Sequence, residues 1–199
     1  MFRQVQTLQL FATALYAQEP AAAERQALEA ALTAAVQALP AGAPPADLHR
    51  RPAFAGLARF AEAMGEAVLQ RLETVQRGLE VTRLEVLVEP PGAAAPARVQ
   101  PNAYLGGLYL LSGAGQWLAS DPRPQAHLLT LPLAEATPAT AEILTLPLVP
   151  GRLLLFPAFL RHQGLPNPGP EPRILFRLAL SFRDFVERLS PPRWDRMSA

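Results

Sequence analysis

Apolar residues recur at helical spacing in two segments near the start of the chain. Residues 21–39 are rich in alanine and carry one apolar face, made of Leu28, Leu32, Val36 and Leu39. Residues 52–78 carry a longer face, made of Phe54, Leu57, Ala61, Met64, Val68, Leu72 and Val75. Steps of three and four residues are typical of an amphipathic helix, and Pro52 and Gly78 suit the two ends of the second segment. The pattern predicts two helices, preceded by a short strand over residues 8–16.

After Gly78 the apolar period changes to two. Residues 81–89 place Leu84, Val86 and Val88 on one face, and Arg83, Glu85 and Glu89 on the other. Short apolar segments between Gly and Pro predict further strands over 97–100, 103–111, 115–119, 127–131, 143–149, 152–157 and 173–182. RDFVERLS predicts a short final helix. Two helices followed by many short strands predict an α+β fold whose β portion is a sandwich or barrel.

Composition narrows the class of protein. The 199 residues are 50% hydrophobic, enough for a sizeable core, and no cysteine or lysine is present. This excludes disulfides, thiolate chemistry and lysine-dependent mechanisms. The arginines are scattered among 17 acidic residues, which argues against nucleic-acid binding. The N-terminus lacks signal-peptide features and no apolar run is long enough to span a bilayer. We expect a soluble bacterial cytoplasmic protein with one domain over residues 1–199, in which an N-terminal strand and helices (1–78) precede a β-barrel core (79–189) and a tail (190–199).

One of the three histidines lies where chemistry is possible. His162 ends the apolar segment that begins at residue 153, and Arg173 begins the next apolar segment eleven residues later. On two antiparallel strands, a metal ligand and an anion-binding group could then face the same interior. The alternative is that His162 bonds to the backbone and Arg173 lies at the surface where its strand begins. The spacing alone leaves both interpretations open.

Several segments resemble a family of 2-oxoglutarate/Fe(II)-dependent oxygenases of the prolyl-hydroxylase-like superfamily, over nearly the whole chain. PGRLLLFPAFLRHQGLPN resembles the family's Gly-x-Leu-x-Leu-Phe-Pro-Ser-Trp-Leu-x-His-x-Val-x-Pro-Asn, and EPRILFRLALSF resembles its Glu-Arg-Ile-Ser-Ile-Ser-Phe-Asn. QPNAYLGGLYLL, SDPR and LFATALY resemble three further segments. The resemblance implies a double-stranded β-helix barrel with two N-terminal helices packed on it. It also implies Fe(II) held by two histidines and a carboxylate, and 2-oxoglutarate held by an arginine.

The resemblance assigns roles to particular residues. His162 matches the distal metal histidine, and Arg173 matches the arginine that anchors 2-oxoglutarate. Arg177, Tyr104 and Tyr109 are further candidates for binding that cofactor.

The chain departs from the family at the other two metal ligands. The family's His-x-Asp or His-x-His pair is replaced by Arg98 and Gln100. Arg98 has no lone pair and carries a fixed positive charge, and Gln100 offers only a weak neutral amide oxygen. Asp121 and His127 are weaker candidate ligands, although an aspartate before Pro122 is also a common turn residue.

Alternation along 173–182 places Arg173 and Arg177 on one face, together with Leu175 and Ala179. Arg98 would add a third positive charge, and such an enclosed cluster is costly without an anion. Alternatively, Arg177 faces solvent or pairs with a carboxylate such as Glu85.

Three functions follow from these observations. The first is a catalytically degenerate oxygenase-like protein that binds an anionic, dicarboxylate-like small molecule. The second is an active but non-standard hydroxylase that uses Fe(II) and 2-oxoglutarate. The third is a metal-free structural or interaction module.

Overall fold

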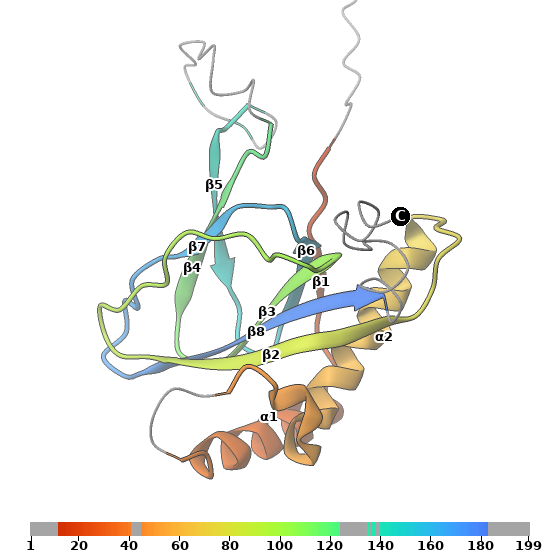
Figure 1. Ribbon diagram of the computed structural model, residues 1–199. Coiled ribbons are helices and arrows are strands. Elements are labelled where there is room, and N and C mark those ends of the chain that lie inside the picture. The colour runs from red at the N-terminus through yellow and green to blue at the C-terminus, as the bar shows by residue number, and fades with distance from the viewer. Residues whose placement is uncertain (1–11, 41–44, 124–134, 136, 138–139, 183–199) are drawn as a thin grey trace, which may run out of the picture.

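The computed structural model describes residues 12–40, 45–123, 135, 137 and 140–182 (Figure 1). Both predicted helices are confirmed: α1 spans Ala22–Gln37 and α2 spans Ala55–Arg71. Two single 3-10 turns, Leu48–Arg50 and Pro52–Phe54, precede α2. Within the described ranges, no helix is long and apolar enough to cross a membrane.

The second helix ends earlier than its apolar pattern predicts. Glu73 adopts a left-handed conformation with φ of 52°, and the amide of Thr74 donates to the carbonyl of Leu69 at 3.1 Å, which closes the helix. Gly78, with φ of 85°, belongs instead to the turn into the first long strand. Its amide donates to Glu66 Oε1 at 2.7 Å, which ties this turn back to α2.

The strands form two antiparallel sheets. The larger sheet has the order β1-β6-β3-β8-β2, with β1 Tyr16–Gln18, β2 Leu79–Glu89, β3 Leu105–Ser112, β6 Leu153–Pro157 and β8 Arg173–Phe182. The smaller sheet has the order β5-β4-β7, with β4 Gly115–Ser120, β5 Ile143–Leu148 and β7 His162–Gly164. An α+β fold with two antiparallel sheets is therefore confirmed.

Six predicted strands are confirmed with small shifts at their ends, two differ from the prediction, and one lies outside the described residues. The N-terminal strand occupies Tyr16–Gln18, so the predicted range 8–16 is wrong over residues 12–15, and residues 8–11 lie outside the described residues. Residues 97–100 form only an isolated bridge between Arg98 and His162, because a proline precedes and another follows this short segment. The short strand β7 was not predicted. Residues 127–131 and the predicted helix in RDFVERLS lie outside the described region of the chain.

The larger sheet is covered on both faces. Figure 1 shows α1 and α2 along one side of β2 and β8, with the smaller sheet on the other side. Leu57, Met64, Leu153, Leu178 and Leu180 are among the buried residues of the helix side. Leu108, Leu110, Phe156 and Leu175 meet Trp117, Ala119 and Leu148 of the smaller sheet. The predicted alternation of β8 is confirmed, because Leu175 faces the smaller sheet and Leu178 faces the helices.

A β-bulge at Thr82 decides which face of β2 looks toward the smaller sheet. Before the bulge Val81 pairs with Leu180, and after it Arg83 pairs with Ala179, so one extra residue lies on β2. Val81 and Leu84 both pack on the helix side, although their parity differs. The bulge therefore turns Glu85 toward the interior between the sheets.

Candidate functional site

His162 begins β7 of the smaller sheet and lies between the segment around Arg98 and β4. The amide of His162 donates to the carbonyl of Arg98 at 2.9 Å, and the amide of Arg98 returns a bond of 2.8 Å. On its other side His162 pairs with Ala119 of β4. The ring packs against Phe156 and Trp117, with centroid separations of 4.8 and 5.6 Å, and His162 is only 4% exposed. The imidazole therefore belongs to an aromatic layer between the two sheets.

The hydrogen bonds of His162 fix its tautomer. Nδ1 lies 2.9 Å from the carbonyl oxygen of Leu160, which can only accept, so Nδ1 carries the proton. Nε2 is buried and has no partner among the described residues. Burial lowers the pKa of His162 foremost; the Leu160 carbonyl works against this, and the positive charges of Arg98 and Arg177 add to the lowering. The ring is thus neutral near pH 7, with a free lone pair on Nε2.

Three arginines gather around Glu85, and we call Arg83, Glu85, Arg98 and Arg177 the Glu85 cluster. Arg177 on β8 lies directly opposite Glu85 on β2, and its Nε donates to Oε1 of that carboxylate. Nη2 of Arg83 lies 3.3 Å from Oε2. Burial raises the pKa of Glu85, but the Arg177 hydrogen bond and the charges of Arg177, Arg83 and Arg98 outweigh burial and leave the pKa lowered. Of the two alternatives for Arg177, pairing with Glu85 is the one observed.

Arg98 is the unpaired member of the Glu85 cluster. Its Nε is buried and makes no hydrogen bond to the described residues. Burial lowers the pKa of Arg98, the charges of Arg177 and Arg83 lower it further, and Glu85 opposes them. The cluster therefore holds three guanidinium groups and one carboxylate, which pairs only with Arg177 and Arg83 among the described residues.

The guanidinium group of Arg173 is paired with other groups of the same chain. It is fully buried, and its Nε and Nη2 lie 2.7 and 2.6 Å from Oε2 of Glu89. Nη2 also donates to the carbonyl of Leu165 at 2.9 Å, and Nη1 lies 3.5 Å from the carbonyl of Ala114. A Cβ added to Gly115 would lie 2.3 Å from Nη1, so glycine is required there for this packing. The guanidinium that the resemblance assigns to 2-oxoglutarate thus already pairs with a carboxylate of this chain.

The other candidate residues are spread around the molecule. Gln100 is buried and its Nε2 donates to the carbonyl of Leu178 at 3.1 Å. Tyr104 lies beside Gln100 in a largely apolar pocket of about 470 Å³, and its ring packs on Phe182 at 5.1 Å. Tyr109 lies on the helix side of the larger sheet, where burial foremost, with a contribution from Glu29, raises its pKa to about 12. Only Gln100 and Tyr104 are therefore neighbours.

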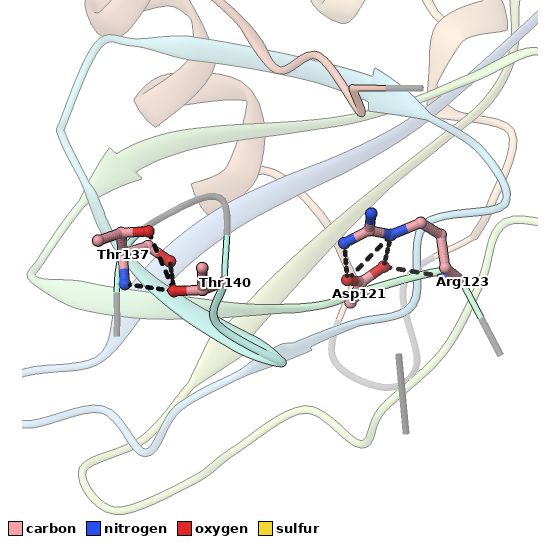
Figure 2. A network of polar contacts seen from close by, with 4 residues as sticks. All are labelled: Asp121, Arg123, Thr137 and Thr140. Carbon is pink, nitrogen blue, oxygen red and sulfur yellow. Dashed lines mark hydrogen bonds and ion pairs between the residues drawn. The ribbon is translucent and has the colours of Figure 1, made fainter. Parts of the chain in front are cut away.

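Asp121 has a local role that the sequence already suggested. Its carboxylate accepts the backbone amide of Arg123 at 3.0 Å and pairs with the Arg123 guanidinium at 2.6 Å, as Figure 2 shows. A side chain that bonds to the backbone two residues later is typical of a turn. His127 lies outside the described residues.

These residues do not fit an Fe(II) centre. No group of three His, Cys, Asp or Glu side chains that could hold a metal exists within the ranges given above. The family resemblance assigns the missing ligand positions to Arg98 and Gln100, and a fixed cation at such a position would repel Fe(II). The carboxylate of Glu85 is already bound to Arg177 and Arg83. The residues fit a 2-oxoglutarate site equally poorly, because Arg173 is already paired with Glu89.

Sequence reasoning missed Glu89 as a partner and left Glu85 as an alternative. A signal for both was present, because the two glutamates are four residues apart on β2 and the two arginines are four residues apart on β8. Antiparallel pairing of equal spacings brings both pairs together once the register is right. The register along the whole strand also includes the bulge at Thr82, which breaks the apolar alternation between Val81 and Leu84 and was not recognised.

Comparisons with known proteins support the fold and nothing finer. No family model matches this chain, and no curated protein sequence matches it. Among solved structures, the alpha-ketoglutarate-dependent epimerase SnoN from nogalamycin biosynthesis superposes with a TM-score of 0.61 at 16% identity, over 85% of this chain and 77% of SnoN. A Pseudomonas putida prolyl-4-hydroxylase gives 0.52 at 14% identity, over 86% and 89% of the two chains. HygX from Streptomyces hygroscopicus, solved with nickel and 2-oxoglutarate bound, gives 0.57 at 13% identity, over 86% and 83%.

The resemblance inferred from the sequence is thus confirmed at the level of the fold. These structural neighbours are 2-oxoglutarate/Fe(II)-dependent oxygenases, and they cover most of this chain at low identity. SnoN has also been solved in complex with Fe3+, alpha-ketoglutarate and nogalamycin RO. Because one fold hosts many functions, the activity has to be argued from the residues of this chain.

Proposed function

We propose that this chain is a metal-independent protein, built on the double-stranded β-helix fold of the oxygenases, that binds a small carboxylate at the Glu85 cluster. The observation that carries the proposal is the charge of the cluster. Arg177 and Arg83 share the one carboxylate of Glu85, and the third guanidinium group, that of Arg98, has no partner among the described residues. An anion supplied from solution would complete the set.

Electrostatics favours such a ligand. Glu85 and Arg177 have side chains only 11% and 9% exposed, whereas Arg83 is 43% exposed, so the cluster reaches from the interior to solvent. Positive charge in a partly buried place is costly unless it is paired, and guanidinium groups bind carboxylates with two parallel hydrogen bonds. A carboxylate approaching beside Arg83 would meet Arg98 and relieve this excess charge.

A structural or interaction module is the second candidate. It is favoured by Arg173, which is satisfied by Glu89, Leu165 and Ala114 and so contributes to the stability of the sheet without any ligand. In this case the Glu85 cluster would join β2 to β8 and bind nothing.

Calorimetry on chelator-treated protein tests the proposal with succinate and 2-oxoglutarate as probes. We expect one dicarboxylate to bind per chain without metal, with an affinity that falls at high salt because the site is cationic. Arg98→Ala should weaken binding by about tenfold or more, since a charge-assisted hydrogen bond is lost. Arg71→Ala, at the end of α2, is the matched control and should bind as the wild type does.

Each other outcome has a clear meaning. Absence of binding at millimolar ligand would reject the proposal and favour the structural module. Binding that appears only when Fe(II) is added would reject it in favour of a non-standard oxygenase. Equal losses in the Arg98 and Arg71 variants would place the ligand elsewhere.

A further inference from the structure

Buried polar atoms without a partner concentrate at this same site. Six side-chain nitrogen or oxygen atoms in the described region of the chain are buried and unpaired. Four of them belong to the Glu85 cluster and its neighbours: Nε of Arg83, Nε of Arg98, Nε1 of Trp117 and Nε2 of His162. Buried polar groups are normally satisfied, so such a concentration indicates a missing partner.

The unpaired atoms lie on neighbouring segments. Arg98 and His162 are joined by two backbone hydrogen bonds, which places both side chains on one face. The Trp117 ring lies 5.6 Å from the His162 ring. A single small molecule beside Arg98 would therefore be within reach of several unpaired atoms at once.

The four unpaired atoms need different hydrogen-bond partners. The two arginine nitrogens and the indole nitrogen are donors, so they require acceptors. His162 Nε2 is the exception, because the proton on Nδ1 is given to the Leu160 carbonyl at 2.9 Å and Nε2 keeps its lone pair. The complementary ligand must supply acceptor oxygens together with one hydrogen-bond donor.

We infer that the ligand is a hydroxycarboxylate, whose carboxylate binds Arg98 and Arg177 and whose neighbouring hydroxyl donates to His162 Nε2. This inference rests on the proposed carboxylate site and names its ligand class. A hydroxyl next to a carboxylate is the smallest group that offers both functions. It is also uncharged at the donor, so it adds no positive charge to the cluster.

The same argument makes 2-oxoglutarate the poorer ligand. Its keto oxygen can only accept, so it would face the lone pair of Nε2 and leave that buried nitrogen unpaired. Replacing the keto group by a hydroxyl keeps the two carboxylates and the chain length and changes only this contact. Sites that bond a ligand hydroxyl discriminate against analogues that lack it, here by about tenfold or more.

The test compares 2-hydroxyglutarate, each enantiomer separately, with 2-oxoglutarate and glutarate by calorimetry on metal-free protein. We expect one enantiomer of 2-hydroxyglutarate to bind about tenfold more tightly than 2-oxoglutarate. Two variants locate the effect. In His162→Asn the side-chain amide can still donate to Leu160 but nothing replaces Nε2, so the preference should disappear. In His162→Gln an amide oxygen can reach the position of Nε2, so the preference should be partly retained.

The outcomes separate this inference from the proposed function. Equal binding of the hydroxy and keto acids, or tighter binding of the keto acid, overturns the hydroxycarboxylate and leaves the anion site intact. A preference that persists in His162→Asn also overturns it, because the donor would then bind elsewhere. Failure of all three acids to bind overturns both proposals. Melting temperatures show whether each variant folds, and the comparison of ligands on the wild type stands without any variant.

Discussion

At the scale of single residues, Arg98 changes what this fold can hold. Its fixed charge lies beside a neutral histidine whose free nitrogen has the tautomer that a metal ligand needs. The histidine is thus prepared to donate a lone pair, while its neighbour excludes the cation that would accept it. An anion that also carries a hydrogen-bond donor could bind both side chains: the anion would pair with Arg98, and the donor would bond to His162 Nε2.

Tyr109 illustrates a polar atom that the fold does not use. Its hydroxyl is buried on the helix side and makes no hydrogen bond to the described residues. We expect Tyr109→Phe to raise the free energy of unfolding by about 1 kcal/mol, because an unsatisfied buried hydroxyl is removed and the ring is kept. Urea denaturation measures this, and Tyr16→Phe, at a partly buried tyrosine, is the control. A destabilised Phe variant would reveal a partner for the hydroxyl.

The Glu85 carboxylate predicts how stability responds to acid. Its pKa in the folded protein lies below the unfolded value of 4.5, despite burial, because of Arg177, Arg83 and Arg98. The carboxylate therefore contributes stability that is fully present above pH 4.5 and is lost as the pH falls through the folded pKa. We expect the stability difference between wild type and Glu85→Gln to shrink as the pH falls from about 7 to about 3.

Chemical denaturation at a series of pH values measures that difference. Glu24→Gln, on the exposed surface of α1, is the control and should follow the wild type. A gap that stays constant, or widens toward acid, would contradict the assigned ion pairs.

At the scale of elements, β2 and β8 are joined by two buried cross-strand ion pairs. Glu89 and Arg173 form the more buried one, with side chains 10% and 0% exposed. Removing one partner leaves the other charge buried and unpaired, so we expect Glu89→Gln to lower the free energy of unfolding by about 3 kcal/mol. Replacing both with apolar residues, Glu89→Leu with Arg173→Met, should cost much less than the single change.

An exposed ion pair supplies the matched control for this experiment. Arg152 and Glu19 lie 2.7 Å apart, with side chains 38% and 37% exposed. Glu19→Gln should change the free energy of unfolding by less than about 1 kcal/mol. If the Glu19 and Glu89 variants lost equal stability, burial would not explain the role of the Arg173 pair.

The elements show what the sequence could and could not predict. Both helices and the faces of β8 followed from apolar spacing, because burial decides those positions. The faces of Leu84, Val86 and Glu85 on β2 also followed, whereas the bulge at Thr82, which breaks that alternation between Val81 and Leu84, was not recognised. His162 and Arg98 were found by chemistry and resemblance. Glu89 as the partner of Arg173 was missed because that pairing depends on register, which local patterns do not fix.

At the scale of the whole molecule, aromatic side chains fill one part of the space between the sheets and buried ion pairs fill another. Trp117 and Phe156 pack with a centroid separation of 5.0 Å, and His162 lies against both. The Arg173 and Arg177 pairs occupy the β2–β8 side of the same interior. The interior between the sheets is thus filled by aromatic packing and by ion pairs between side chains of this chain.

This view predicts that two substitutions would create a metal site. Arg98→His with Gln100→Asp would supply a histidine and a carboxylate at the two positions that the family resemblance assigns to metal ligands, and would remove the excluding charge. We expect the double variant to bind Co(II), a visible stand-in for Fe(II), at least about a hundredfold more tightly than the wild type. The d–d absorption bands of Co(II) measure this, and His162→Asn in the same background should abolish the gain. Arg98→Ala alone supplies no ligand, so it should gain little. If the wild type already bound Co(II) tightly, or if Arg98→Ala matched the double variant, other side chains would hold the metal and the metal-independent function would be untenable.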